Sequence, residues 1–422
     1  MTAALAAVLL LAAGASPAGP VLTLDEAVKL ARQGQPTLRQ ARSATAAAEA
    51  RRGEALSGFL PRLDAGLGYT RLSTNLAGTP ESWASTSRWT ASATASMVVW
   101  DFGATLGRYQ SASALAASQQ ATERATTAQV LLNVRSAFFA ARARKDLVAV
   151  AEETLANQQA HLVQVEGFVS VGTRPEIDLA QARTDRANAE VTRIGAVANY
   201  QTAKAQLNQA MGLEASTDFE VADDQLPEVP GEDATLDQLA EEALKARPEV
   251  AAMEAQLRAQ EATVTAARGG WFPSLSVSAG MNDIGTGLAG PDATWNWNAG
   301  ASLSWNLFEG GMTRSLVREA EAGAESVRAQ LASLRLQVRL ELEQARFAVS
   351  SARAKLVATG EALASARDRL RLADGRYQAG SGSALEQSDA QLQVTLASAQ
   401  RVGAQYDLST ARAQLLEALG RP

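Results

Sequence analysis

The stretch from Trp295 to Trp305 reads W-N-W-N-A-G-A-S-L-S-W, and apolar residues alternate with polar residues or glycine along its whole length. Successive side chains of a β-strand point to opposite faces, so this alternation predicts a strand with one apolar and one polar face. Its length suits a strand that crosses a bilayer at a tilt, which takes about 9–11 residues. Tryptophans stand at both ends of the apolar face, a pattern typical of the aromatic girdles of transmembrane β-barrels.

Three other segments alternate in the same way, at residues 62–72, 89–100 and 274–281. Every tryptophan of the chain lies in or beside these four segments, and such clustering is typical of tryptophan at a membrane surface. We predict that the membrane-interface aromatics are Trp89, Trp100, Trp295, Trp297 and Trp305. A soluble sandwich with one buried face is the alternative. The polar faces carry Ser, Thr, Asn and Gly rather than Lys and Glu, which favours the membrane.

Composition excludes several classes of function. The 422 residues carry a net charge of −6 and contain no run of Lys or Arg, which argues against a nucleic-acid partner. The absence of cysteine, together with a single histidine, His161, excludes thiol chemistry and cysteine-based metal sites. No nucleophile–histidine pair, phosphate-binding loop or ligand cluster stands out. We therefore expect no enzyme, no cofactor and no metal site.

The N-terminal residues form a short apolar core followed by small side chains, which fits a secretory signal peptide. We expect the signal peptide at residues 1–15, with cleavage after Ala15 or Ala18; a buried N-terminal helix is the alternative. No other run reaches 18 apolar residues, so no transmembrane helix is predicted. An exported chain of this kind would lie in or beyond the periplasm, or in an outer membrane crossed by a closed barrel.

The chain contains two copies of one unit, at residues 23–212 and 235–420, joined by an acidic connector at residues 213–234. Thr23-Leu24-Asp25 recurs as Thr235-Leu236-Asp237, and Gly58-Phe59-Leu60-Pro61 recurs as Gly270-Trp271-Phe272-Pro273, both at the same separation along the chain. Matches further along need only small changes in loop length. This pattern predicts a tandem duplication, with the connector either packed on helices or mobile.

Each copy is predicted to be mainly α-helical outside its two strands. Short helices come first, with Pro36 and Pro248 each opening the second one. Long helical hairpins follow the strands, at residues 103–212 and 310–420, and contain apolar positions spaced as in a coiled-coil seam. Abundant alanine favours a wall of closely packed helices, and a two-stranded coil is the alternative. Capping boxes at Thr173–Glu176 and Ser383–Glu386 are predicted to start the returning helices.

Four strands cannot close a barrel across a bilayer, because the open edges would leave backbone groups unpaired in lipid. Copies of the chain must therefore share one barrel, and a closed ring is the natural arrangement. Three copies would give a 12-stranded β-barrel continued by an α-barrel of twelve helices, which together form a duct.

The sequence resembles the TolC-type outer membrane efflux proteins. The matching motifs are the duplicated starts (Leu24 to Pro36, Leu236 to Pro248), the G-x-x-P junctions (Gly58–Pro61, Gly270–Pro273), the segments after the strands (Trp100–Gly103, Phe308–Gly311) and the turn Val171–Asp178. The resemblance implies a homotrimer in the lipid of the cell outer membrane with a periplasmic helical extension. It also implies docking on a periplasmic adaptor protein and an inner-membrane transporter, and outward passage of drugs, small molecules or proteins. A periplasmic coiled-coil scaffold or adaptor without a barrel is the alternative function.

Five residues at or beside the hairpin turns are candidates for a gate, namely Arg174, Asp178, Tyr377, Glu386 and Asp389. Carboxylates in a first helical turn favour the helix dipole, and this structural role is one interpretation. The other is that copies of these groups surround the lumen. We predict that Tyr377 bonds a neighbouring carboxylate such as Asp178 and holds the turns together. His161 is expected to be a solvated helix residue.

Overall fold

The computed structural model describes residues 20–75, 83–232, 234–285 and 294–421. The predicted signal peptide at residues 1–15, with its cleavage sites after Ala15 and Ala18, lies outside these residues. So do parts of the two segments between predicted strands, roughly residues 73–88 and 282–294, for which their Gly, Ser, Thr, Asn and Pro predict exposed loops.

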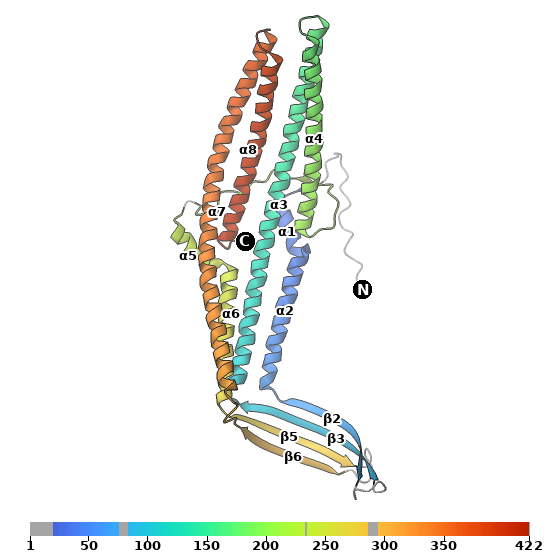
Figure 1. Cartoon of the computed structure of the whole chain (residues 1–422), viewed down its shortest axis with the longest axis vertical. Coiled ribbons are helices and arrows are strands. Elements are labelled where there is room, and N and C mark those ends of the chain that lie inside the picture. Colours follow the sequence, from blue (N-terminus) through green and yellow to red (C-terminus); the bar gives the residue numbers. More distant parts are fainter. Residues whose placement is uncertain (1–19, 76–82, 233, 286–293, 422) are drawn as a thin grey trace. The chain divides into compact units, whose positions relative to one another are not determined.

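Both copies contain the same elements in the same order (Figure 1). The first copy comprises α1 (Leu24–Gly34), α2 (Pro36–Leu56), η1 (Ser57–Phe59), β2 (Arg62–Asn75), β3 (Trp83–Trp100), α3 (Ala104–Ser170) and α4 (Glu176–Met211). The second comprises α5 (Leu236–Ala246), α6 (Pro248–Arg268), η2 (Gly269–Trp271), β5 (Ser274–Gly285), β6 (Trp295–Ser304), α7 (Met312–Gln378) and α8 (Ala384–Ala418). The long helices α3 and α7 each have 67 residues, which a tandem duplication would produce.

Local signals set the helix ends. The hydroxyl of Thr23 accepts a hydrogen bond from the backbone N–H of Glu26, and the Glu26 carboxylate accepts one from the N–H of Thr23, so a capping box starts α1. Pro36 and Pro248 are the first residues of α2 and α6, where a missing N–H costs nothing. Gly212 ends α4 at φ 74°, a left-handed conformation that glycine adopts without strain.

The capping box predicted at Thr173–Glu176 is wrong. Pro175 is the residue before α4, and the Thr173 hydroxyl instead donates to the carbonyl of Phe168 at 2.9 Å. The last carbonyls of α3 lack helical partners, so they compete for this donor. At the second turn, the Ser383 hydroxyl does accept from the N–H of Glu386 at 3.2 Å, but the Glu386 carboxylate bonds Arg376.

The four long strands form one antiparallel sheet in the order β2-β3-β5-β6. Its register places Leu63, Ala95, Ala279 and Ala299 side by side across the sheet. The next row along consists of Arg62, Ser96, Ser278 and Gly300, and the side chains of its three non-glycine residues point to the opposite face. The sheet therefore has the one apolar and one polar face that the alternation predicted.

Three strands extend further than predicted. β2 continues to Asn75, β3 begins at Trp83 and β5 continues to Gly285, so residues predicted as loop pair across the sheet; β6 ends one residue early, at Ser304. The Ser and Thr that suggested loops are compatible with strands on a polar face. The ladder of backbone hydrogen bonds continues where two such segments lie opposite each other.

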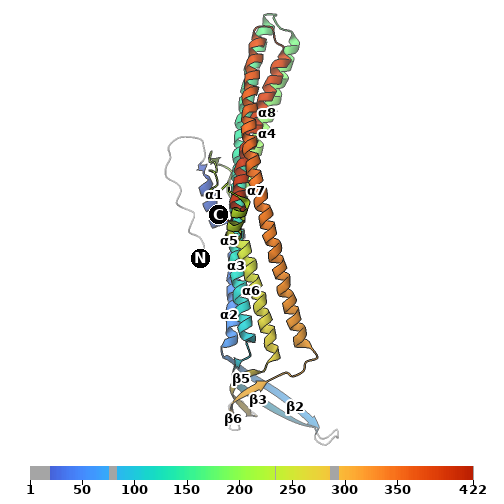
Figure 2. The same cartoon turned by 90° about the vertical axis from the view of Figure 1, so that its left-hand side faces the viewer.

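The chain forms two compact units, and each takes residues from both copies. The turn unit comprises Met1–Arg39, Thr126–Ala246 and Val338–Pro422, and the sheet unit comprises Gln40–Ala125 and Arg247–Gln337. In the turn unit, the α3–α4 and α7–α8 hairpins lie side by side (Figure 1 and Figure 2), and the hydroxyls of Thr154 and Thr395 are 3.0 Å apart. One core cluster of this unit includes Phe138, Leu207 and Met211. Val264, Ala320 and Ala324 form a smaller cluster in the sheet unit.

The acidic connector is packed against helices of the turn unit. Its strand β4 (Glu220–Val221) pairs in parallel with β1 (Val21–Leu22). The carbonyl of Val221 accepts from Lys145, and the carboxylate of Glu232 contacts Arg353 at 2.6 Å and Arg412 at 3.4 Å. Basic residues of the helices therefore hold the connector in place. Among the residues described, no helix is both long and apolar enough to cross a membrane.

Candidate functional site

The two hairpin turns share one backbone geometry. Gly172 and Gly380 adopt φ 75° and 74°, and in each turn the N–H of the glycine bonds the carbonyl three residues before it. The next N–H bonds a carbonyl five residues back, from Thr173 to Phe168 and from Ser381 to Arg376, both at 3.0 Å. This is the Schellman arrangement, which pairs the last carbonyls of α3 and α7.

Arg174 connects the first turn to the second. Its guanidinium donates to the carbonyls of Tyr377 and Gly382 at 3.1 and 3.3 Å, and its central carbon lies 4.4 Å from the centre of the Tyr377 ring. A cation is favourable at a helix C-terminus, and a guanidinium over a phenol ring adds a cation–π attraction. We call this set of contacts the turn contact.

Tyr377 is the buried side of the turn contact, with 1% of its surface exposed. Its hydroxyl makes no hydrogen bond within the described part of the chain, so the predicted bond to Asp178 is absent from the single chain. Burial raises the pKa of Tyr377, an effect that Arg174 opposes and the Asp178 carboxylate reinforces. Asp178 therefore acts on Tyr377 through its charge rather than through a hydrogen bond.

His161 is not the solvated residue that we expected. Its ring lies 5.5 Å from the ring of Tyr377, and its Nδ1 is buried without a partner among the described residues. It lines a polar cavity of about 220 Å³ between α3, α7 and α8, together with Asp374 and Gln387. Gln158 and Val165, three residues before and four after it, are buried, and that helical spacing could have placed His161 on the packed face.

Glu386 and Asp389 are not among the residues that form the turn contact. Glu386 pairs with Arg376 at 2.8 Å, and Asp389 is exposed on α8. Two unpredicted carboxylates link the helices instead: Asp374 of α7 accepts from Gln387 at 2.6 Å, and Asp185 of α4 accepts from Ser388 at 3.0 Å. The structure therefore brings together Arg174 and Tyr377, with Asp178 close enough to act through its charge.

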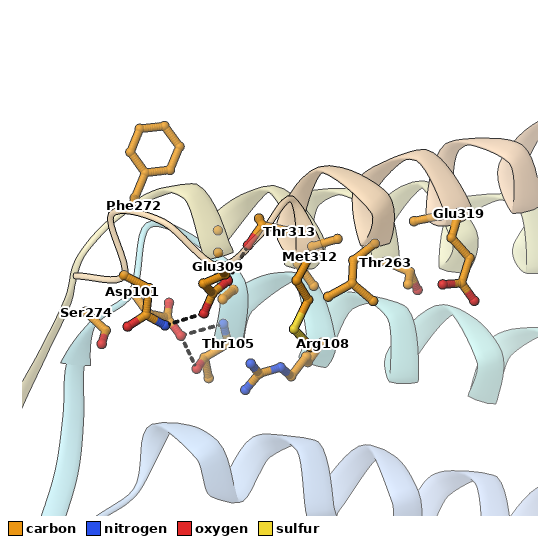
Figure 3. A pocket seen from close by; sticks show the side chains of 18 of the residues that line it. Asp101, Thr105, Arg108, Thr263, Phe272, Ser274, Glu309, Met312, Thr313 and Glu319 are labelled. Atoms are coloured by element: carbon orange, nitrogen blue, oxygen red, sulfur yellow. Dashed lines mark hydrogen bonds between the residues drawn. The ribbon is translucent and has the colours of Figure 1, made fainter. Parts of the chain in front are cut away.

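A larger cavity, of about 800 Å³, lies in the sheet unit where the strands join α3 and α7 (Figure 3). Asp101 accepts from the backbone N–H and the hydroxyl of Thr105 and so caps α3, and Glu309 accepts from the hydroxyl of Thr313 near the start of α7. Both copies therefore turn from strand to helix with a carboxylate followed by a threonine. The sequence motifs at Trp100–Gly103 and Phe308–Gly311 mark these two turns.

The predicted interface aromatics lie in the strands or immediately after them. Trp297 is 82% exposed, and Trp100, Trp295 and Trp305 are also exposed, whereas Trp89 packs partly against Tyr69. The Trp305 side chain donates to the carbonyl of Trp271 at 3.2 Å, an amphipathic placement that suits a membrane surface. No second layer of described residues covers these side chains, which counts against the soluble sandwich.

Comparison with known proteins agrees with this architecture. The family model described as "Outer membrane efflux protein" matches residues 27–213 and 239–421, one match in each copy. The toluene efflux pump outer membrane protein TtgC of Pseudomonas putida is 26% identical over 315 residues, which are 72% of this chain and 63% of that protein. The chain therefore spans less than two thirds of the length of this curated relative.

Two solved structures share the fold. The outer-membrane channel OprN superposes with a TM-score of 0.82 at 22% identity, covering 94% of this chain and 90% of that one. The outer membrane protein VceC from Vibrio cholerae gives 0.80 at 19% identity, with 94% and 96% covered. These likenesses confirm the predicted fold class, tandem helical hairpins with a four-stranded β part. Because the family model matches most of the chain, this protein belongs to the outer membrane efflux protein family, and with it to the outer membrane.

Proposed function

We propose that three copies of this chain form a channel that conducts substrates from the periplasm to the outside. The observation that carries the proposal is the sheet, whose apolar face is uncovered and whose outer strands, β2 and β6, each have a partner on one side only among the described residues. In lipid, every backbone donor and acceptor must be paired within protein. Pairing β2 of one copy with β6 of the next closes the sheet into a barrel of twelve strands.

The channel would be the outer part of a tripartite efflux or type I secretion system. The turns carry exposed apolar side chains, including Val171, Ile177 and Leu385, and such surfaces mark contacts with other proteins. A periplasmic adaptor protein is the partner that we propose for them, with an inner-membrane transporter supplying the substrate. The uncovered apolar sheet argues against a scaffold without a barrel.

We further propose that the turns form the narrow end of the channel. Three copies of Asp178, Glu386 and Asp389 would place carboxylates around one opening and favour cations there. Arg174 and Tyr377 would hold the two turns of each copy together while the opening is closed. The helix-dipole role of the same carboxylates is compatible with this gate.

The experiment is to extract the protein from outer membranes in detergent, determine its mass by light scattering and record single-channel currents in planar bilayers. The expected result is a mass of three copies and stable conductance with cation selectivity. Asp178→Ala is expected to reduce the selectivity, whereas Glu241→Gln, which removes an exposed carboxylate far from the turns in sequence, is the matched control. A monomeric, water-soluble protein without conductance would contradict the proposal.

A further inference from the structure

Tyr377 is contacted by two basic side chains. The guanidinium of Arg174 lies 4.4 Å from the ring centre, and the imidazole ring of His161 lies 5.5 Å from it. Arg174 is always charged, whereas histidine changes its charge between pH 5 and 8. The turn contact therefore contains one permanent cation and one group that becomes a cation when the pH falls.

Among the described residues, Nδ1 of His161 is buried and makes no hydrogen bond, and the same holds for Oε1 of Gln387 in the same cavity. The side chains of α8 that line the cavity are neutral: Gln387, Ser388 and Gln391. Those contributed by α3 besides His161 do not titrate either: Asn157, Gln158, Ala160 and Gln164.

Charged groups face His161 from two helices and one turn. Asp374 lies on α7, Asp178 and Asp185 lie on α4, and all three carboxylates favour the protonated imidazole. Burial acts in the other direction and is the larger effect, so the pKa of His161 lies below its ordinary value. Arg174 is the one cation that contacts the same phenol ring among the described residues.

We propose that His161 makes the turn contact sensitive to protons, so that acidification favours separation of the two turns. Its unprotonated ring packs on Tyr377 while the turns are together. In a separated state, the same ring is solvated and accepts a proton more readily. Protons therefore bind the separated state better than the closed one, and by linkage they shift the equilibrium toward separation.

The sign and range of the effect follow from this linkage. In the separated state the imidazole is solvated and its pKa is about 6.5, whereas in the closed state the pKa is lower. Well above pH 6.5 the histidine is neutral in both states, so the equilibrium between them does not depend on pH. As the pH falls below 6.5, the ratio of separated to closed molecules rises by up to about tenfold per pH unit. The rise ends when the pH reaches the lower pKa of the closed state. The window from pH 7.5 to 5.5 spans the ordinary pKa of histidine, and variants of His161 separate its titration from that of other groups, such as Asp146 of α3, whose pKa burial raises.

The first test measures the titration of His161 directly. The chain contains a single histidine, so histidine labelled with ¹³C gives one imidazole signal in NMR of the detergent-extracted protein, provided that purification uses a tag without histidine. A midpoint below 6.5 is the expected result. A midpoint at or above 6.5 would mean a solvated or stabilised imidazolium and would overturn the proposal.

The second test measures the separation of the turns. Hydrogen exchange of residues 165–180 and 374–386, corrected for the intrinsic effect of pH, is compared at pH 7.5 and 5.5. Protection in the wild type is expected to fall by up to about tenfold, whereas protection in His161→Gln and His161→Phe stays constant. Gln keeps a polar side chain and Phe keeps the ring, so the loss of pH dependence in both variants assigns it to the titration. An equal pH response in either folded variant refutes the idea.

The consequence for conductance rests on the proposed function, and the two can be separated. Suppose that the wild type conducts but its open probability does not rise at pH 5.5 relative to that of His161→Gln. The proposal of a proton-sensitive turn contact is then wrong, and the proposed channel function is kept. If hydrogen exchange depends on pH as expected but no conductance is seen at any pH, the proposed channel function is wrong and the proton-sensitive turn contact is kept.

Discussion

Arg174 satisfies several needs of the turns with one side chain. The last carbonyls of α7 lack helical donors, and the guanidinium supplies two hydrogen bonds to that region. Its flat face covers the Tyr377 ring at the same time. Lysine has the charge but neither the fork of donors nor the flat face, so it cannot replace these contacts together.

This division of roles predicts different effects for two conservative substitutions. Tyr377→Phe removes a buried hydroxyl that has no partner in the described chain, so stability should stay constant or rise by up to about 1 kcal/mol. Arg174→Lys should weaken the turn by about 1–2 kcal/mol through the lost stacking and hydrogen bonds. Hydrogen exchange at residues 165–180 measures the stability of the turn in both variants. If Tyr377→Phe loosens the turns as much as Arg174→Lys, the hydroxyl bonds a neighbouring copy.

At the scale of single residues, the sequence predicted the neighbourhood but not the partners. The sequence predicts Arg174 as a gate candidate beside the first turn, and Gly382 stands at the corresponding position of the second copy. It did not show that Arg174 bonds the carbonyl of that same glycine, because the two turns are more than 200 residues apart. The prediction for Thr173 is wrong because a threonine hydroxyl can accept from a helix N–H or donate to a nearby carbonyl, and here it donates to the carbonyl of Phe168.

At the scale of elements, close helix packing depends on small side chains at particular positions. In the sheet unit, α3 and α6 approach each other closely at Gly107. A Cβ at that position would lie 2.6 Å from the backbone nitrogen of Ala266 and 2.8 Å from the carbonyl oxygen of Ala262. Backbone atoms cannot move aside as a flexible side chain can. By contrast, a Cβ at Gly53 of α2 would meet nothing within 4 Å.

Gly107→Ala and Gly53→Ala form a matched pair of substitutions, both inside helices. Gly107→Ala should destabilise the protein by about 1–3 kcal/mol because α3 and α6 must separate. Gly53→Ala should stabilise it by about 0.5–1 kcal/mol, because alanine loses less backbone entropy on folding into a helix. Thermal unfolding followed by circular dichroism in detergent compares them. Equal effects of the two substitutions would show that α3 and α6 are not in close contact at Gly107.

Periodicity predicted the helices better than it predicted their neighbours. In α7 the predicted seam consists of Leu331, Leu334, Val338, Leu342, Ala345, Val349, Ala352 and Leu356, and all of them except Leu334 and Leu356 are buried. The seam follows from the heptad pattern alone, because burial repeats along one face of the helix. Gly107 and Gly53 are the same residue type in similar helical sequence, and only the approach of a second helix distinguishes them.

At the scale of the whole molecule, the sheet decides what the chain requires from its surroundings. Its polar row (Arg62, Ser96, Ser278, Gly300) and its apolar row (Leu63, Ala95, Ala279, Ala299) lie on opposite faces. The polar face is suited to contact with water, and the apolar face is suited to contact with lipid. The alternation in the sequence predicted these faces, but it could not predict the order β2-β3-β5-β6, which joins the two copies through β3 and β5.

Adjacent residues of β5 test the two faces, because Ser278 and Ala279 belong to opposite rows. The chain has no cysteine, so Ser278→Cys and Ala279→Cys can each be labelled without background. In proteoliposomes, a bimane label at position 279 should be strongly quenched by doxyl-labelled lipids, because its side chain would face hydrocarbon in the proposed barrel. A label at position 278 should escape that quenching, and the unlabelled Ser278→Cys variant should react readily with a charged, membrane-impermeant maleimide, because its side chain would face the water-filled interior of the proposed ring. Each residue is the control for the other, since both share one strand and one depth. Similar quenching at both positions would mean that the sheet does not separate lipid from water, and the shared barrel would have to be abandoned.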